Sequence, residues 1–452
     1  MASALLQITE PGQAALKESK KQPPVRLAGI DLGTTHSLIA LPQSADSADI
    51  LPIDGHPLMP SAVYWYRPDP PLVGRPALEQ AESTSRPCFV SFKRAMGKSA
   101  GELQAASLPF AITKASAQPD APALLSIANQ LESAQAPEAL SAQVLAKLAQ
   151  QAQEHLGGPL EGAVITVPAY FDDNQRHATL NAAKLAGIPV LRLIAEPTAA
   201  ALAYGLHEQA VEKVLVYDLG GGTFDCSVLV QRQGVFEVRA TSGDTALGGD
   251  DIDRALAQTV LERHQLQPAD LQPQQAHALM QRCRAAKEQL SDQSTADIVF
   301  EAGAPDSVQS YTDRCDRPEL ASICQSLIQR TLAFCRRALR EAEIEREDLQ
   351  AVVLVGGSTR LQPLIDQVAE FFPCPLHQSI DPDQAVALGA ALHARALSQP
   401  SAGSLLVDVV PLSLGIEMLG GLTETVIPRN TPIPAIKARE FTTAQDNQSA
   451  MS

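Results

Sequence analysis

One short pattern occurs twice in this chain and constrains its fold more than any other feature of the sequence. The pattern is an apolar segment, an Asp-Leu-Gly turn and a second apolar segment, and it fills residues 25–42 and again residues 213–230. Each copy predicts a β-hairpin, because apolar runs flank a turn that contains glycine and hydroxyl residues. An internal repeat of this kind indicates two duplicated halves that face one ligand.

The segments between the two copies mix helix and strand patterns, and the chain is too long for one core. Its 452 residues exceed the roughly 250–300 at which a single domain stops growing. Apolar residues have helical spacing in 142–156, whereas 162–167 and 351–355 are short apolar runs typical of buried strands. A long helical region is expected to follow residue 251 and to reach about Ser291. We also predict turns around a ligand in three glycine-rich segments: 247–251, 355–360 and 387–392.

The overall composition excludes several classes of function. A formal net charge of −16 repels a phosphate backbone, so nucleic acid is not expected as a partner. No stretch reaches the roughly 18 uninterrupted apolar residues of a membrane-spanning helix, and the first two dozen residues lack the apolar core of a secretion signal. The seven cysteines include no Cys-x-x-Cys pair, and we interpret them as reduced thiols of a cytoplasmic protein.

The two Asp-Leu-Gly turns have the residue types that hold a magnesium-bound triphosphate. Glycines let backbone N–H groups approach phosphate oxygens, hydroxyls add donors, and carboxylates suit Mg²⁺ directly or through its waters. One such turn alone is more often a tight hairpin with an aspartate cap, but the pair together favours a nucleotide. No Walker sequence is present. The predicted phosphate and metal residues are Asp31, Gly33, Thr34, Thr35, Asp218, Gly220, Gly221, Gly222, Thr223 and Asp225.

Hydrolysis also needs a cation near the transferred phosphoryl group and an oriented water. Lys93 is a candidate cation, although an isolated lysine is usually a solvated surface charge. Glu196 begins a predicted helix after an apolar strand, where a carboxylate can orient a water. The alternative for Glu196 is a helix N-terminal carboxylate that only interacts with the helix dipole.

Seven longer motifs closely resemble the ATPase domain of the DnaK-type heat-shock chaperones. They are DLGTT, VITVPAYFDDNQR, AEPTAAALAYGL, YDLGGGTFD, GDTALGGDDID, VGGSTR and DPDQAVALGAAL, in the family's order. The resemblance implies an α/β fold: a two-lobed, actin-like ATPase with a duplicated ribonuclease H-like motif, followed by a partial β-sandwich. ATP or ADP, Mg²⁺ and any K⁺ would be its cofactors. ALLQITEPG, VIPRNTPIP and EFTTAQDNQSAM further resemble the HscA branch, which serves iron–sulfur cluster assembly.

The resemblance also implies roles for individual residues. The catalytic positions fall on Lys93, Glu196, Thr223 and Asp225. The metal ions would lie around Asp31, Asp218 and Asp225. Adenosine would be recognised by Lys287, Ser291, Gly356, Gly357, Ser358, Arg360 and Asp383. Pro168 and Arg176 match a switch that relays the nucleotide state to the second domain, whereas His36 stands at a variable phosphate-loop position.

One pair of residues departs from the family pattern near the adenosine. Many relatives have Glu and Arg gripping the adenosine, whereas this chain has Arg284 and Glu288. This reversed charge pair is expected to weaken adenosine binding or to change which residues hold the adenosine.

Four regions are expected along the chain. They are a flexible tail (1–24), the ATPase domain (25–398), an interdomain linker (399–408) and a β-rich peptide-binding domain (409–452) that stops inside an expected strand and is therefore truncated. The linker motif is Leu405, Leu406, Val407 and Asp408. The resemblance places Ile416, Leu419, Phe441 and Met451 in the peptide cleft, with core packing of the sandwich as the alternative.

The expected function is that of a chaperone in which ATP hydrolysis controls the binding of a client peptide. The resemblance implies a J-domain co-chaperone of the HscB type and an IscU-like scaffold as client. A sugar-type kinase shares the actin-like fold, but it needs a base beside a substrate hydroxyl, and no separate candidate is visible. The chain could also be a general DnaK-type folding chaperone or an actin-like filament protein, and sedimentation with ATP would identify the filament.

Overall fold

The computed structural model describes most of the chain between residues 26 and 438. The residues in that range that it does not describe are 45, 67–69, 85, 87, 104–110, 115–121, 127–133, 206–211, 233–234, 305, 399–405, 408, 411, 419–421 and 433–434. The predicted tail over 1–24 lies outside the described residues. So do Leu405 and Asp408 of the linker, and Leu419, Phe441 and Met451 of the peptide cleft.

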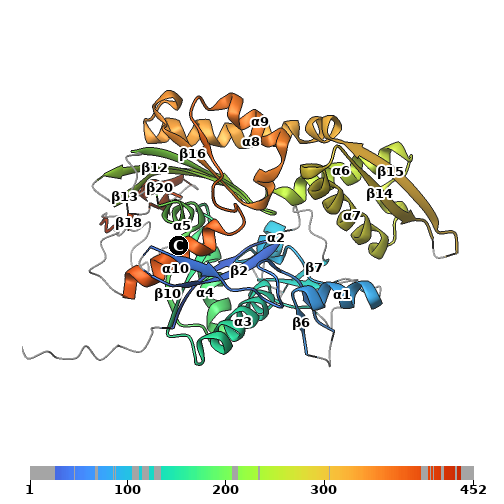
Figure 1. Cartoon of the computed structure of the whole chain (residues 1–452), viewed down its shortest axis with the longest axis horizontal. Helices are drawn as coiled ribbons and strands as arrows, with labels where there is room; N and C mark the ends of the chain where they lie inside the picture. The colour runs from blue at the N-terminus through green and yellow to red at the C-terminus, as the bar shows by residue number, and fades with distance from the viewer. Residues whose placement is uncertain are drawn as a thin grey trace, which may run out of the picture.

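Helices and strands alternate along most of the chain (Figure 1). The strands are β1 Leu27–Leu32, β2 His36–Pro42, β3 Ala48–Ile50, β4 Met59–Pro60, β5 Val63–Tyr64, β6 Leu72–Val73, β7 Ala111–Lys114, β8 Ala123–Ser126, β9 Gly162–Val167, β10 Val190–Ala195, β11 Lys213–Leu219, β12 Phe224–Arg232, β13 Val235–Asp244, β14 Thr295–Ala302, β15 Gln309–Asp316, β16 Ala351–Val355, β17 Leu376–His377, β18 Leu406–Val407, β19 Leu414–Met418 and β20 Leu422–Ile427. The α-helices are α1 Arg75–Thr84, α2 Ala100–Leu103, α3 Pro137–Leu156, α4 Asp173–Leu185, α5 Glu196–Ala203, α6 Gly249–Arg263, α7 Pro273–Asp292, α8 Arg317–Ala342, α9 Gln362–Phe371 and α10 Ala385–Ser398. Short 3-10 helices are η1 Phe92–Ala95, η3 Pro268–Asp270, η4 Arg346–Asp348 and η5 Gly357–Arg360.

Two sheets with the same topology form the centres of two lobes. The sheet of lobe I has the order β10-β9-β1-β2-β3, and the sheet of lobe II has the order β17-β16-β11-β12-β13-β18. In each sheet the Asp-Leu-Gly hairpin is antiparallel, and its first strand also pairs in parallel with a later strand, β9 or β16. The duplication predicted from the sequence is therefore confirmed, and with it the α/β, actin-like fold class.

Helices α5 and α10 lie between the two sheets and connect the two lobes through a shared apolar core (Figure 1). The two helices approach closely at Gly389, where an added Cβ would lie 1.7 Å from the carbonyl oxygen of Ala199. On the other side of α10, a Cβ on Gly29 of β1 would lie 2.0 Å from the backbone nitrogen of Ala391. The predicted turn over 387–392 is therefore wrong, because these small residues let a continuous helix pack against backbone on both sides.

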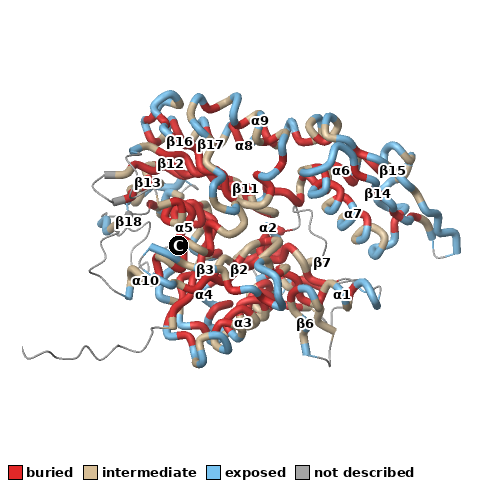
Figure 2. The backbone as a smooth tube through the Cα atoms, viewed as in Figure 1, coloured by how far each residue is buried: buried red, intermediate tan, exposed pale blue. Residues whose placement is uncertain are grey.

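Helices α3, α4 and α8 pack on the outer faces of the two central sheets, whereas α7 packs on β14 of the separate β14–β15 hairpin. Helices α3 and α4 pack on lobe I, and α6, α7 and α8 surround a separate core in lobe II. Asp172 and Gln175 form a capping box that starts α4. The expected long helical region is in fact two helices, α6 and α7, because Pro268 and Pro273 cannot continue a helix across the gap. Figure 2 shows that the central strands of both sheets are buried, whereas the β14–β15 hairpin is largely exposed.

The segment after α10 returns to lobe II before it forms a separate hairpin. Strand β18 adds to the edge of the lobe II sheet, where Leu406 pairs with Phe236 and Val407 with Glu237 of β13. Val409 is buried in the core shared by the two lobes. Beyond it, β19 and β20 pair with each other and with no other strand that the structure describes, and Ile416 of β19 is half-buried. The domain boundaries remain predictions. No helix among the described residues has the length and apolar character that crossing a bilayer requires.

Candidate functional site

The two Asp-Leu-Gly loops face each other at the junction of the lobes. A Cβ on Gly221 would lie 1.9 Å from the hydroxyl of Thr35, and one on Gly222 would lie 2.5 Å from Cγ2 of Thr34. Glycine is therefore required at these positions in lobe II, because the loop of lobe I leaves no room for a side chain. The Thr35 hydroxyl is buried and has no hydrogen-bond partner among the described residues. A buried donor of this kind is the expected mark of a missing polar ligand.

Three aspartates from the two loops lie in surroundings that disfavour their charge. Thr166 donates a hydrogen bond of 3.0 Å to Asp31, whereas Asp218 and Asp225 are paired across the hairpin of lobe II. Loss of hydration, followed by the charge of Glu196, raises the pKa of Asp31 to about 7 and that of Asp225 to about 8. The same two causes, with the neighbouring aspartates, raise the pKa of Asp218 well above its ordinary value. The surrounding protein therefore does not stabilise the negative charges of these aspartates, and binding of a cation beside them would do so.

The aspartates suit an ion that is held partly through water. Among the residues that the structure describes, no three carboxylate, thiol or imidazole groups converge on one point closely enough to ligate a metal directly. Mg²⁺ usually keeps several waters in proteins and binds one or two carboxylates together with phosphate oxygens. The donor set therefore fits a hydrated Mg²⁺ that arrives with a nucleotide, rather than a metal bound by the protein alone.

Lys93 and Glu196 form a buried ion pair beside the aspartates. Nζ of Lys93 lies 2.8 Å from Oε1 of Glu196, and their side chains are only 5% and 9% exposed. Lys93 comes from η1 and Glu196 is the first residue of α5, so long-range packing brings them together. Lys93 is therefore not a solvated surface lysine. Glu196 also contributes to the raised pKa of all three aspartates, which places its charge close to them.

Only some of the residues predicted to recognise adenosine lie close to the Asp-Leu-Gly loop of lobe II. The Ser358 hydroxyl donates to the carbonyl of Gly220 at 3.0 Å, and Lys287 donates to the carbonyl of Gly249 at 3.0 Å. These bonds bring η5 to the Asp-Leu-Gly loop of lobe II and α7 to the start of α6. Gly356 has a φ of 83°, which favours glycine, and Gly357 faces Asp383. Arg360 forms ion pairs with Asp381 and Asp383, whereas the carbonyl of Ser291 accepts a hydrogen bond from Arg317.

A set of polar side chains that joins the two lobes was not predicted from the sequence. From lobe I, the Ser91 hydroxyl donates to Asp250 at 2.7 Å and Arg94 donates to Asp251 at 2.6 Å. Both aspartates lie in the first turn of α6, and we call these four residues the interlobe clamp. The LGGDD motif is interpreted from sequence only as a glycine turn. The lobe I partners of its aspartates are more than 150 residues away, so no local pattern could identify them.

Arg284, which departs from the family pattern, extends the interlobe clamp within lobe II. It forms ion pairs with Asp250 and with Asp253, and Lys287 also pairs with Asp253 at 2.7 Å. These cations lower the pKa of Asp250 against the opposing effect of its burial. Arg284 is therefore neutralised by α6, so its positive charge is not directed at a ligand. Burial raises the pKa of its reversed partner, Glu288.

The predicted switch residues lie beside Asp225. The carbonyl of Pro168 accepts a hydrogen bond of 3.1 Å from the backbone of Phe171, and Phe171 in turn accepts one of 3.2 Å from Arg176. Between them, the backbone N–H of Tyr170 donates to the Asp225 carboxylate at 3.1 Å. A turn of lobe I thus contacts an aspartate of lobe II. His36, at the start of β2, has a pKa lowered by burial and makes no contact that assigns it a role.

The raised pKa values predict how stability depends on pH in the chain without metal or nucleotide. Unfolded aspartates ionise near pH 4, whereas Asp31 and Asp225 hold their protons in the folded chain until about pH 7 and 8. Between about pH 4 and pH 8 the folded chain binds more protons than the unfolded chain, so its free energy of unfolding falls as pH rises. Urea unfolding should give a lower free energy at pH 8.5 than at pH 6. Asp225→Asn should show a smaller fall, and an equal fall in both proteins would contradict the assignment.

Comparisons with known proteins agree with this architecture. The family model described as Hsp70 protein matches residues 27–452. Relatives named chaperone protein HscA homolog come from Burkholderia pseudomallei (strain 668), Burkholderia mallei (strain SAVP1) and Burkholderia thailandensis (strain E264). Each is 46% identical to this chain over 457 residues, which cover 99% of this chain and 71% of the relative.

Proposed function

The chain belongs to the Hsp70 family of ATP-dependent chaperones, and from this premise we propose that it acts in iron–sulfur cluster assembly with its nucleotide bound between the lobes. The contact of Gly221 and Gly222 with Thr35 and Thr34 is the observation that carries the proposed site. The assembly role rests on the HscA homologs among its relatives. A sugar-type kinase is not favoured, because the family match extends through the linker and the β-rich segment.

We assign the catalytic roles as follows. The glycines of both loops present backbone N–H groups to the phosphates, and Thr34, Thr35 and Thr223 add hydroxyl donors. Glu196 orients the attacking water and accepts its proton, while Lys93 holds that carboxylate in place and offers a positive charge to the γ-phosphate. Mg²⁺ would neutralise charge on the phosphates when bound. Asp31, Asp218 and Asp225 would hold its waters from both lobes.

A steady-state ATPase assay tests the proposed function. We expect slow hydrolysis by the chain alone and faster hydrolysis when an HscB-type J-domain protein and a peptide of an IscU-like scaffold are added together. A peptide of reversed sequence is the matched control. ATP consumption that depends strictly on a sugar would favour the kinase instead. Equal stimulation by unrelated unfolded peptides would support a general folding chaperone and contradict the proposed client.

The linker strand gives a physical route from the nucleotide to the second domain. Asp225 is the second residue of β12, which pairs along its length with β13, and β18 pairs with the beginning of β13. The N-terminal end of β12 also contacts lobe I through Tyr170. A change in lobe closure would therefore move the sheet edge on which the linker lies. We propose that ATP favours this docked linker and that hydrolysis releases it.

Replacing both Leu406 and Val407 with proline should release the linker. Strand β18 is two residues long and is held by its backbone pairing to β13, and proline removes both of its backbone donors. We expect a protease to cut the linker of the double variant equally fast with and without ATP, whereas the parent chain gains protection with ATP. The exchange L406V/V407L keeps a strand-forming pair and is the control. Retained ATP protection in the proline variant would argue against docking through β18.

A further inference from the structure

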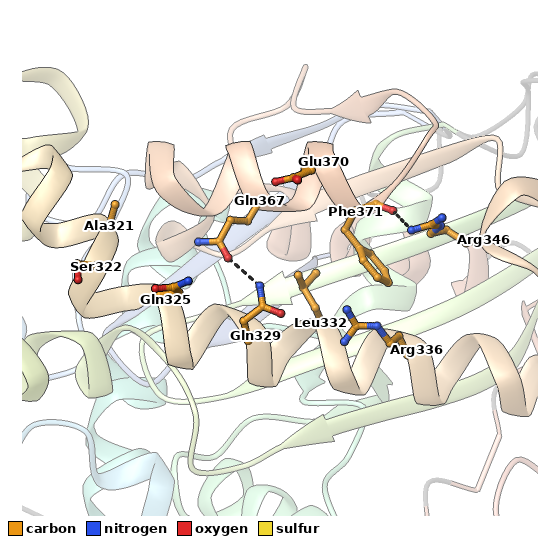
Figure 3. A pocket seen from close by; sticks show the side chains of 10 residues that line it. All are labelled: Ala321, Ser322, Gln325, Gln329, Leu332, Arg336, Arg346, Gln367, Glu370 and Phe371. Carbon is orange, nitrogen blue, oxygen red and sulfur yellow. Dashed lines mark hydrogen bonds between the residues drawn. The ribbon is translucent and has the colours of Figure 1, made fainter.

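The outer face of lobe II contains a groove that neither the nucleotide site nor the linker uses. It runs between α8 and α9, has a volume of about 580 Å³, and is lined by Ala321, Ser322, Gln325, Gln329, Leu332, Arg336, Arg346, Gln367, Glu370 and Phe371 (Figure 3). The α8 residues recur every three or four positions, so one face of the helix forms a wall. The volume lies within the range of known ligand sites, about 300–1,000 Å³.

One end of the groove is cationic. The ring of Phe371 lies between two guanidinium groups, with Arg336 at 4.7 Å and Arg346 at 5.2 Å from its centroid (Figure 3). Arg346 is held in place because it donates to the carbonyl of Phe371 at 2.9 Å. Its only ion pair among the described residues is with exposed Glu347, and Arg336 has none within the same part of the chain. Arg336 can therefore bind a carboxylate directly, and Arg346 can do so by exchanging the exposed Glu347 carboxylate that its Nε and Nη2 now hold.

The middle of the groove is suited to a peptide backbone. Gln325, Gln329 and Gln367 present side-chain amides, which both donate and accept hydrogen bonds as peptide groups do. Gln329 and Gln367 currently bond to each other at 3.1 Å across the groove (Figure 3). Leu332 forms an apolar floor below them. A purely inorganic anion would use the cationic end and leave the amides and the floor unexplained.

We propose that this groove binds an acidic peptide segment of a partner protein. A carboxylate of the segment pairs with Arg336 and Arg346, its backbone bonds to the glutamines, and one apolar side chain rests on Leu332. Nucleic acid, which needs cations along its whole phosphate backbone, is disfavoured because the groove has two arginines, both at one end. Helices α8 and α9, which form its walls, lie on the side of the lobe II sheet away from α5 and α10 (Figure 1), and none of the lining residues belongs to the candidate site. Its occupant is therefore bound independently of the proposed nucleotide site.

Fluorescence anisotropy with two labelled pentapeptides tests the proposal. The probe is Glu-Leu-Glu-Leu-Asp, and its neutral twin is Gln-Leu-Gln-Leu-Asn, each with fluorescein at the N-terminus. We expect the acidic probe to bind and the twin to bind at least tenfold more weakly. Arg336→Glu should weaken binding of the probe by about tenfold or more, as expected for loss of a charge-assisted bond. Arg340→Glu makes the same charge change on α8 outside the groove and should leave binding unchanged.

Two further measurements separate the outcomes. Arg336→Gln is a second variant, which removes the positive charge without reversing it. Unchanged urea unfolding and unchanged ATP hydrolysis in both Arg336 variants would show that the loss of probe binding is local. Equal binding of the twin, or an effect of R340E as large as that of R336E, would overturn the proposal. Full displacement of the probe by succinate at the probe's own concentration would also overturn it, because the groove would then be a small-dicarboxylate site. None of the peptide-binding results tests the proposed ATP hydrolysis between the lobes.

Discussion

Glu196→Gln is expected to lower ATP turnover by at least about a hundredfold while ATP and Mg²⁺ still bind, as expected for loss of a general base. Glutamine keeps the size of the side chain and can still accept a hydrogen bond from Lys93, 2.8 Å away in the parent. Only the negative charge and the proton-accepting capacity are lost. Single-turnover hydrolysis measures the chemical step, and isothermal titration of ATP with Mg²⁺ measures binding.

Two controls make the Glu196 result specific. Glu161→Gln removes a carboxylate from an exposed ion pair with Arg26 and should leave turnover unchanged. The charge of Glu196 also raises the pKa of Asp31 and Asp225, so E196Q should move the pH dependence of unfolding to lower pH. A structural role without chemistry would not lower turnover at constant binding. Turnover within twofold of the parent would remove Glu196 from the catalytic assignment.

Gly389→Ala is expected to lower the free energy of unfolding by about 3 kcal/mol or more, at or beyond the upper end for overpacked cores. The added Cβ would lie 1.7 Å from the Ala199 carbonyl oxygen, and α10 cannot retreat because Ala391 is already against Gly29 of β1. Helix propensity predicts the opposite sign, since alanine stabilises a helix by about 1 kcal/mol relative to glycine. Urea unfolding decides between the two effects.

Gly101→Ala is the matched control for that experiment. Gly101 lies in the short helix α2, and among the described residues its added Cβ would meet only the Ser99 hydroxyl, at 3.9 Å. This substitution should leave stability unchanged or raise it slightly. If Gly389→Ala were as stable as the parent, the close contact between α5 and α10 would not exist as described.

Local sequence patterns predict the strands and the duplication but not the contacts between distant segments. The strands over 162–167 and 351–355 match β9 and β16, because unbroken apolar runs are typical of buried parallel strands. The helix over 387–392 is not predicted, because a glycine needed for helix contact has the same local signal as one in a turn. Lys93 and Glu196 are both candidates from sequence, but only folding brings them 2.8 Å apart.

The functional roles depend on a different kind of information. The resemblance assigns Pro168 and Arg176 to a switch. Between them, the backbone N–H of Tyr170 contacts Asp225, and a backbone contact could not be predicted from the side chain. The interlobe clamp has no motif of its own, since serine, arginine and aspartate are common surface residues. Arg284 is expected from sequence to disturb the adenosine grip, whereas its bonds to Asp250 and Asp253 tie it to α6. The roles of the individual site residues remain predictions.

The two ends of the cleft are held by different forces. Around α5 and α10 the lobes share an apolar core that includes Val164 and Val216, whereas the clamp of Ser91, Arg94, Asp250 and Asp251 is polar. Salt screens buried ion pairs much less than exposed ones, and the side chains of Arg94 and Asp251 are only 7% and 18% exposed. The molecule should therefore behave as a hinge with a fixed apolar pivot and a polar catch that loosens only slightly as ionic strength increases.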